Sequence, residues 1–179
     1  MGYVNATACA LVLCSHLTYA EFTLAETSTS SDRRGTIVIM DKDKYQCALL
    51  VPEPGKTILY NFTDSKSPCK NDTAREIEFN EIPSATEIVL ADSATCYLSG
   101  GYFSFKFKTT RKSTTTDYIE LEYFKSYHPG AIVKPGLQLI NSWVKPGEHP
   151  LRDKLSCVQI TASPKPPEAV AETSTPPQP

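Results

Sequence analysis

The sequence predicts an all-β domain, an antiparallel β-sandwich or Greek-key barrel with about eight short strands and two disulfides. Three observations favour this fold class. Short runs of β-branched and aromatic residues alternate with polar ones, turn-forming residues separate these runs, and almost no segment between them has helical periodicity. The length of 179 residues suits one domain with its own core better than two.

The expected strands follow one another through residues 35–162. Gly35 opens the first run of β-branched residues, and the turn residues 52–55 stop the second. The expected strand ranges are 36–40, 45–51, 56–62, 75–79, 86–91, 103–108, 117–125, 136–143 and 155–161. Two of these ranges, 75–79 and 86–91, are expected to form a hairpin.

Alternation is clearest in the strand 103–108. Phe103, Phe105 and Phe107 must share one face of it, and that face is expected to be buried. The segment 117–125 is expected to pair antiparallel with this strand, which sets lysines opposite glutamates on the exposed face. In that register the inward residues are Ile119, Leu121 and Tyr123.

The N-terminal residues indicate export. Residues 1–20 carry no charged side chain, and the apolar run ends on Thr18-Tyr19-Ala20 before the chain turns polar. This layout is typical of a secretory signal peptide cleaved after Ala20. The apolar run is shorter than the roughly 20 residues that span a bilayer, so we expect a secreted or periplasmic protein without stable membrane insertion. A lipid or helical membrane anchor is the alternative.

Both ends of the mature chain are expected to stay unfolded. Residues 21–34 hold little apolar surface, and residues 163–179 form a polar tail rich in proline. Segments of this composition remain extended and solvated. The expected organisation is therefore a signal peptide at 1–20, a flexible segment at 21–34, the all-β domain at 35–162 and a disordered tail at 163–179.

Four cysteines remain once the signal peptide is removed, and they are Cys47, Cys69, Cys96 and Cys157. An even number in an exported domain predicts two disulfides, and no C-x-x-C spacing supports a zinc or redox site. Cys69 and Cys96 lie at nearly equal distances from the turn of the expected hairpin. We therefore expect a Cys69–Cys96 disulfide, which leaves Cys47–Cys157. A Greek-key connection between these strands would weaken this inference.

One part of the chain resembles a known family. The segments Cys69-Lys70-Asn71-Asp72 and 82–90 are similar to the latter half of a βγ-crystallin-type Greek-key motif, as found in small secreted microbial proteins. In that family a segment of the form (Asn/Asp)-(Asn/Asp)-x-x-(Ser/Thr)-Ser supplies calcium ligands. The matching positions are 80–85, where Asn80 and Ser84 fit while Glu and Ala hold the second and last places. The resemblance implies a Greek-key fold and leaves open a calcium site near Asn80 and Ser84.

The sequence offers little to carry catalysis. His128 and His149 each precede a proline in turn-like sequence, and neither has metal-ligand spacing to another histidine. The chain contains no nucleophile-elbow, phosphate-loop or metalloprotease motif. The net charge of -2 gives no field that would attract nucleic acid. We therefore expect no catalytic residue, no bound metal, no cofactor and no nucleic-acid partner.

Two features favour binding instead. Arg111 and Lys112 lie in a polar loop at 109–116, and loops on a rigid scaffold are where recognition usually occurs. Tyr118 and Phe124 are expected on the charged strand face, where an exposed aromatic ring can contact a sugar or a protein. These four residues are the candidate binding set.

The expected function is that of an exported, disulfide-stabilised, non-catalytic binding module for an extracytoplasmic protein or glycan. A secreted hydrolase inhibitor or toxin-like effector is the alternative, and an enzyme of unknown type is the third possibility. Asn61 and Asn71 begin glycosylation sequons, which are used only in a eukaryotic source. The identity of the ligand and the oligomeric state stay open.

Removal of residues 164–179 is expected to leave the melting temperature unchanged to within about two degrees, with both disulfides formed. A proline-rich polar segment cannot bury enough surface to offset the roughly 1–2 kcal/mol per residue that ordering a backbone costs. Thermal unfolding of the full chain and the truncated chain checks this. A drop of about ten degrees would mean that the tail packs on the domain.

Overall fold

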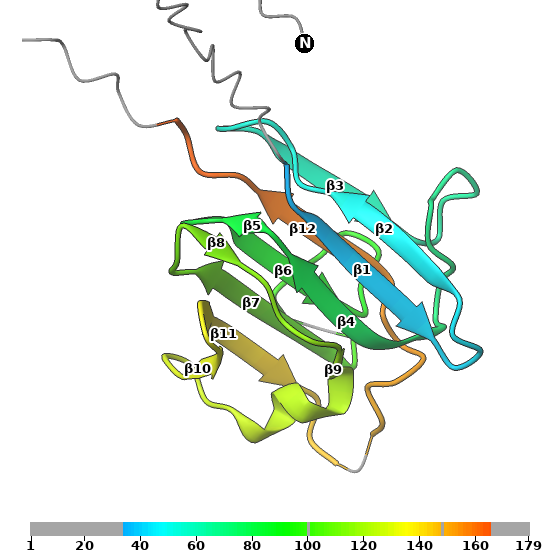
Figure 1. The fold of residues 1–179 in the computed structure, drawn as a ribbon. Helices are drawn as coiled ribbons and strands as arrows, with labels where there is room; N and C mark the ends of the chain where they lie inside the picture. Colours follow the sequence, from blue (N-terminus) through cyan, green and yellow to red (C-terminus); the bar gives the residue numbers. More distant parts are fainter. Residues whose placement is uncertain (1–33, 100, 148, 166–179) are drawn as a thin grey trace, which may run out of the picture. The chain divides into compact units, whose positions relative to one another are not determined.

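Two antiparallel sheets form a sandwich in the computed structural model, which describes residues 34–99, 101–147 and 149–165 (Figure 1). This confirms the predicted all-β class. The predicted signal peptide, nearly all of the segment 21–34 and most of the tail 163–179 lie outside the described residues.

The smaller sheet has four strands in the order β2-β1-β4-β9. Its strands are β1 (Thr36–Asp41), β2 (Gln46–Leu50), β4 (Ala74–Asn80) and β9 (Ile119–Glu120). Gly35 leads into β1, where a Cβ atom would come within 2.5 Å of the Glu81 carbonyl oxygen. Glycine therefore allows the start of β1 to lie against the end of β4.

The larger sheet has six strands in the order β10-β11-β7-β6-β12-β3. Its strands are β3 (Thr57–Asn61), β6 (Glu87–Ala91), β7 (Phe103–Thr109), β10 (Ile132–Lys134), β11 (Leu137–Val144) and β12 (Cys157–Thr161). A separate short ladder joins β5 (Ile82–Pro83) to β8 (Ser113–Thr114). The described residues thus contain twelve strands, more than predicted, because strands of two or three residues are too short to show alternation.

The core between the two sheets is built on a row of phenylalanines. Phe103, Phe105 and Phe107 are fully buried on one face of β7, as the alternation predicted. Phe79 of β4 meets Phe107 edge to face from the opposite sheet, with ring centroids 6.2 Å apart. Aromatic pairs in this arrangement stabilise a core beyond the area that they bury.

A short helix replaces the predicted strand at 117–125. After β9, the 3₁₀ helix η1 (Leu121–Ser126) has a period of three residues, so Leu121 and Phe124 share its buried face. Two expectations for this segment are therefore wrong. Phe124 is fully buried, with its ring 4.8 Å from that of Phe107, whereas Tyr123 is 43% exposed.

Two predicted strand pairings are also wrong. The segments 75–79 and 86–91 belong to β4 and β6, which lie in different sheets, so they form no hairpin. Strand β7 pairs with β6 and β11 rather than with the segment 117–125. The lysine–glutamate pairing on its exposed face therefore involves β6, where Glu87 lies 2.8 Å from Lys106.

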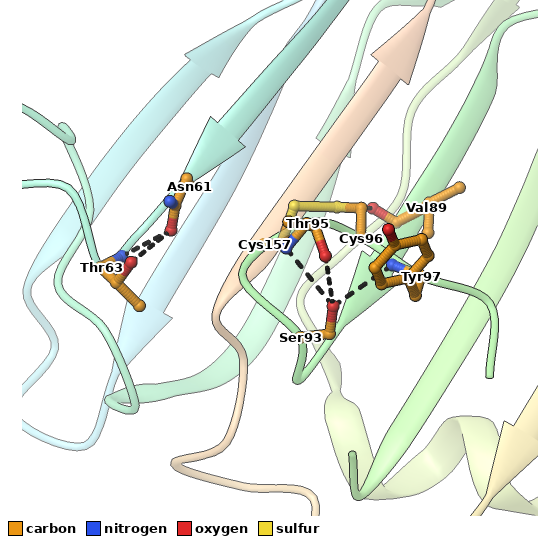
Figure 2. Close-up of a disulfide and its surroundings, with 8 residues drawn as sticks. All are labelled: Asn61, Thr63, Val89, Ser93, Thr95, Cys96, Tyr97 and Cys157. Carbon is orange, nitrogen blue, oxygen red and sulfur yellow. Dashed lines mark hydrogen bonds between the residues drawn. A yellow bond between two sulfur atoms is a disulfide. The ribbon is translucent and has the colours of Figure 1, made fainter. Parts of the chain in front are cut away.

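The disulfides join Cys47 to Cys69 and Cys96 to Cys157, each with a Cα–Cα distance of 5.4 Å. The predicted pairs were wrong because they relied on the hairpin that does not form. Cys157 is the first residue of β12 and pairs with Ala91 of β6. Cys96 lies in the loop that follows β6 and is bonded to Cys157. Figure 2 shows the Cys96–Cys157 bond on the outer side of the six-stranded sheet, beside Val89.

Both disulfides indicate that the domain folds in an oxidising compartment. Across the described ranges 34–99, 101–147 and 149–165, no helix is long and apolar enough to cross a membrane.

The period of η1 predicts losses of stability of very different size for two neighbouring aromatic residues. Phe124→Ala should lower the free energy of unfolding by about 3–5 kcal/mol because it opens a cavity between the Phe105 and Phe107 rings. Tyr123→Ala should lower it by about 1 kcal/mol or less, since this ring is partly exposed. Urea unfolding of both variants checks this. Similar losses for the two would contradict the helical period.

Candidate functional site

Two neighbouring depressions lie where β9 passes into η1. The first, here called the tyrosine depression, has a volume of about 440 Å³ and is lined by Tyr118, Ile119, Glu120, Glu122, Tyr123 and Lys134. The second, the charged depression, has a volume of about 230 Å³ and is lined by Asp41, Lys42, Lys44, Arg75, Glu76, Glu120, Glu122 and Arg152. Glu120 and Glu122 line both, so the two depressions form one continuous surface.

The register of β9 against β4 places Tyr118 and Glu120 on this surface. Ile119 pairs with Ile77, and both side chains are buried in the core. Because side chains alternate along a strand, the residues on either side of Ile119 face outward. Burial of Ile119 therefore determines that Tyr118 and Glu120 face the tyrosine depression.

Carboxylates of β4 hold the Tyr118 phenol. Burial raises the pKa of Tyr118, and the charge of Glu78, its hydrogen bond with the phenol, and the charge of Glu76 raise it further. The phenol is thus a hydrogen-bond donor at neutral pH. Its ring is half-buried and forms part of the depression wall.

Two glutamates face each other across the β4–β9 ladder. Glu76 pairs directly with Glu120, an arrangement that is unfavourable for like charges. Lys44 approaches Glu76 to 3.3 Å and offsets part of this repulsion. Glu120 is exposed, and no ion pair to it is present within the described residues. The surface therefore presents a carboxylate that could bind a cation from outside.

Glu122 has a different role, which is to hold a loop. Its carboxylate accepts hydrogen bonds from the backbone N–H groups of Leu151 and Arg152, and it lies 2.7 Å from Lys125. Burial opposes ionisation of Glu122, but the hydrogen bonds from Lys125, Leu151 and Arg152 outweigh it and lower the pKa of this carboxyl. Glu122 is a positioning residue for the wall of both depressions.

Tyr123 forms the outer rim of the tyrosine depression. Tyr127 packs edge-on against its ring at 5.1 Å and donates a hydrogen bond of 2.6 Å to its hydroxyl. That donation, together with burial, raises the pKa of Tyr127. On another side the ammonium group of Lys134 lies 5.6 Å from the centroid of the Tyr123 ring. The face of Tyr123 therefore already attracts a cation within the chain.

The structure brings together only part of the predicted binding set. Tyr118 lines the tyrosine depression, whereas Phe124 lies buried beneath it and is not available to a ligand. Arg111 and Lys112 are exposed in the turn between β7 and β8, and neither lines either depression.

Sequence reasoning missed Glu120, Tyr123 and Lys134. For Tyr123, the signal that could have found it is the three-residue spacing of Leu121 and Phe124, which is typical of a 3₁₀ helix rather than of a strand.

Neither of the two histidines considered in the sequence lines either depression. His128 is exposed, and the His149 ring packs against Tyr102 with a centroid distance of 5.4 Å. Among the described residues, no group of three or more histidine, cysteine, aspartate or glutamate side chains is arranged to hold a metal ion. The calcium site near Asn80 and Ser84 that the resemblance left open stays open.

The lowered pKa of Glu122 predicts a pH-dependent contribution to stability. Its pKa in the folded protein lies below the ordinary value of 4.5, so the stabilisation is complete above that value and is lost as the pH falls through the folded pKa. Glu122→Gln should therefore unfold more easily than the wild type at pH 7, and the difference should shrink towards pH 3.

Urea unfolding at a series of pH values measures this difference. Glu120→Gln is the matched control and should be as stable as the wild type or slightly more stable at pH 7, because it relieves the repulsion from Glu76. A difference for Glu122→Gln that stays constant with pH would show that its charge is not what holds the loop.

Comparison with known proteins gives no relative. No protein-family model, no curated protein and no solved structure matches this chain.

Proposed function

We propose that this chain is an extracytoplasmic binding module that holds a basic side chain of a partner protein in the tyrosine depression. The observation that carries this proposal is the juxtaposition of Glu120 with the Tyr118 and Tyr123 rings in one depression. A carboxylate beside aromatic rings provides both ion pairing and cation–π attraction for a guanidinium or ammonium group.

The chemistry of the surrounding surface supports a cationic ligand. Among the described residues, four lysine ammonium groups lie 5.2–5.6 Å from the ring centroids of three tyrosines, Tyr45, Tyr102 and Tyr123, so cations do approach tyrosine rings in this domain. A ligand cation beside Glu120 would also relieve the repulsion between Glu76 and Glu120. A contact that weakens the free protein but suits a ligand is typical of a binding site.

Protonation also favours binding over proton transfer. The raised pKa values of Tyr118 and Tyr127 keep both phenols protonated at neutral pH, and the lowered pKa of Glu122 keeps that carboxylate ionised. None of these groups is poised to exchange a proton near pH 7. The two disulfides support a role outside the reducing cytoplasm.

The test is a selection of random displayed peptides on the immobilised protein, run beside a panel of neutral and acidic oligosaccharides. The retained peptides should be enriched in arginine or lysine, and their binding should weaken as salt rises. Glu120→Gln and Tyr118→Ala should each weaken that binding about tenfold or more, because a hydrogen bond to a charged group contributes roughly 1.5–3 kcal/mol.

Lys112→Ala is the matched control, since Lys112 is exposed but lies outside the depression. It should bind the selected peptides as the wild type does. Retention of oligosaccharides instead of basic peptides would replace the protein ligand with a glycan. Unchanged peptide binding by Glu120→Gln would remove the depression from the proposal.

A further inference from the structure

The two glycosylation sequons have opposite geometries in the folded domain. The sequon at Asn61 ends strand β3, which is the edge strand of the six-stranded sheet. The sequon at Asn71 lies two residues after a disulfide cysteine, in the connection to β4. The two sequons match the same tripeptide pattern in the sequence, but the hydrogen bonds of their asparagine side chains differ in the structure.

Asn61 forms a turn with Thr63 that leaves its amide nitrogen available. Its Oδ1 atom accepts a hydrogen bond of 2.7 Å from the Thr63 hydroxyl and one of 2.9 Å from the Thr63 backbone N–H (Figure 2). The Asp64 N–H donates to the Asn61 carbonyl oxygen, which closes the turn. Within the described residues, no hydrogen bond uses the Nδ2 group of Asn61.

Neighbouring contacts fix this turn in place. Phe62 is 3% exposed, and its N–H donates to the Ser156 carbonyl oxygen at 2.8 Å. Asn61 itself pairs with Cys157, and both side chains lie on the outer face of the sheet, as Figure 2 shows. A large group on Asn61 could therefore extend into solvent without disturbing the core.

Asn71 is arranged the other way round. Its Nδ2 group donates a hydrogen bond of 2.7 Å to the Asp72 carboxylate, and its Oδ1 atom is buried without a partner. The Thr73 hydroxyl donates to the Lys70 carbonyl oxygen and not to Asn71. The amide nitrogen that would be modified is already hydrogen-bonded, and the Thr73 hydroxyl makes no hydrogen bond to the amide oxygen of Asn71.

We propose that Asn61 is an N-glycosylation site and that Asn71 is not. In the reaction, the Nδ2 atom of Asn61 attacks the anomeric carbon of an oligosaccharide linked to a lipid pyrophosphate, and a carbon–nitrogen bond forms. The bond between that carbon and the phosphate oxygen breaks, the pyrophosphate leaves with the electron pair, and Nδ2 gives up one proton to a base. No oxidation or reduction occurs.

A glycan at Asn61 also suits the position of this residue in the sheet. Edge strands expose unpaired backbone groups that can pair with another chain, and a bulky hydrophilic group at the edge blocks such pairing. Strand β3 is such an edge, whereas Tyr118 and Glu120 lie at the β9 end of the other sheet. Lys134, which also lines the depression, belongs to β10 at the opposite edge of the six-stranded sheet from β3, so the glycan would lie away from the tyrosine depression.

The test is expression of the full chain in eukaryotic secretory cells, followed by intact mass measurement before and after treatment with a peptide N-glycosidase. The wild type and Asn71→Gln should each carry one glycan, and Asn61→Gln should carry none. Removal of the glycan converts the modified asparagine to aspartate, so peptide mass mapping locates the site directly.

Two further variants test the role of the Thr63 hydroxyl. Thr63→Val keeps the bulk of the side chain and should lose the glycan, whereas Thr63→Ser keeps the hydroxyl and should retain it. Peptide mapping of the Cys96–Cys157 disulfide shows that each secreted variant has folded. A wild-type chain without a glycan, or a glycan on Asn71, would overturn the proposal.

Discussion

The packing of buried Phe124 against the rings of Phe105 and Phe107 is the contact on which the rest of the candidate site depends. It requires a helical turn after β9, because the two-residue period of a strand would put Leu121 and Phe124 on opposite faces, whereas the 3₁₀ helix puts both against the core. Once those two side chains point inward, Tyr123 must point outward. The apolar packing of the sandwich thus determines where an aromatic ring reaches solvent.

Polar contacts then shape the surface that this packing exposes. Glu122 ties the loop before β12 to η1 by accepting hydrogen bonds from two backbone N–H groups, and it lines both the tyrosine and the charged depression. The β4–β9 register places Glu120 directly opposite Glu76. Two like charges in this position repel, so electrostatics alone would not favour this register. The register is instead set by Ile77 and Ile119, since burying both isoleucines is worth more than the repulsion between two partly exposed carboxylates costs.

The strands could be predicted from the sequence, but their partners could not. Alternation is a local property, and it correctly identified the buried face formed by Phe103, Phe105 and Phe107. Pairing depends on which sheet each strand joins, which no local pattern records. The connection through β5 carries the chain from one sheet to the other between β4 and β6, so the expected hairpin and the disulfides inferred from it were both wrong.

Because local sequence patterns do not record pairing between distant segments, the candidate site could be predicted only in part. Tyr118 could be predicted as outward-facing because it neighbours Ile119 in a true strand, whereas Phe124 was misplaced because the period changes at Leu121. The sequence placed Glu120 on the exposed face of an expected strand, where a glutamate is ordinary and signals no binding site. It becomes informative only when the fold sets Glu76 opposite it and the two tyrosines beside it.

The disulfide topology separates the two outer faces of the sandwich. The Cys96–Cys157 bond fastens the loop after β6 onto the outer side of the six-stranded sheet, where Val89 and the two cysteines form a small second core. The loop covers Val89, but Tyr97 and Leu98 of the same loop stay exposed and line a depression of about 450 Å³ on this face. The outer end of the four-stranded sheet has no such cover among the described residues, and its accessible groups at β9 are carboxylates and tyrosine rings. The opposed carboxylates of Glu76 and Glu120 at this end weaken the free protein, and the cationic ligand proposed above would give that arrangement a role that stability alone does not.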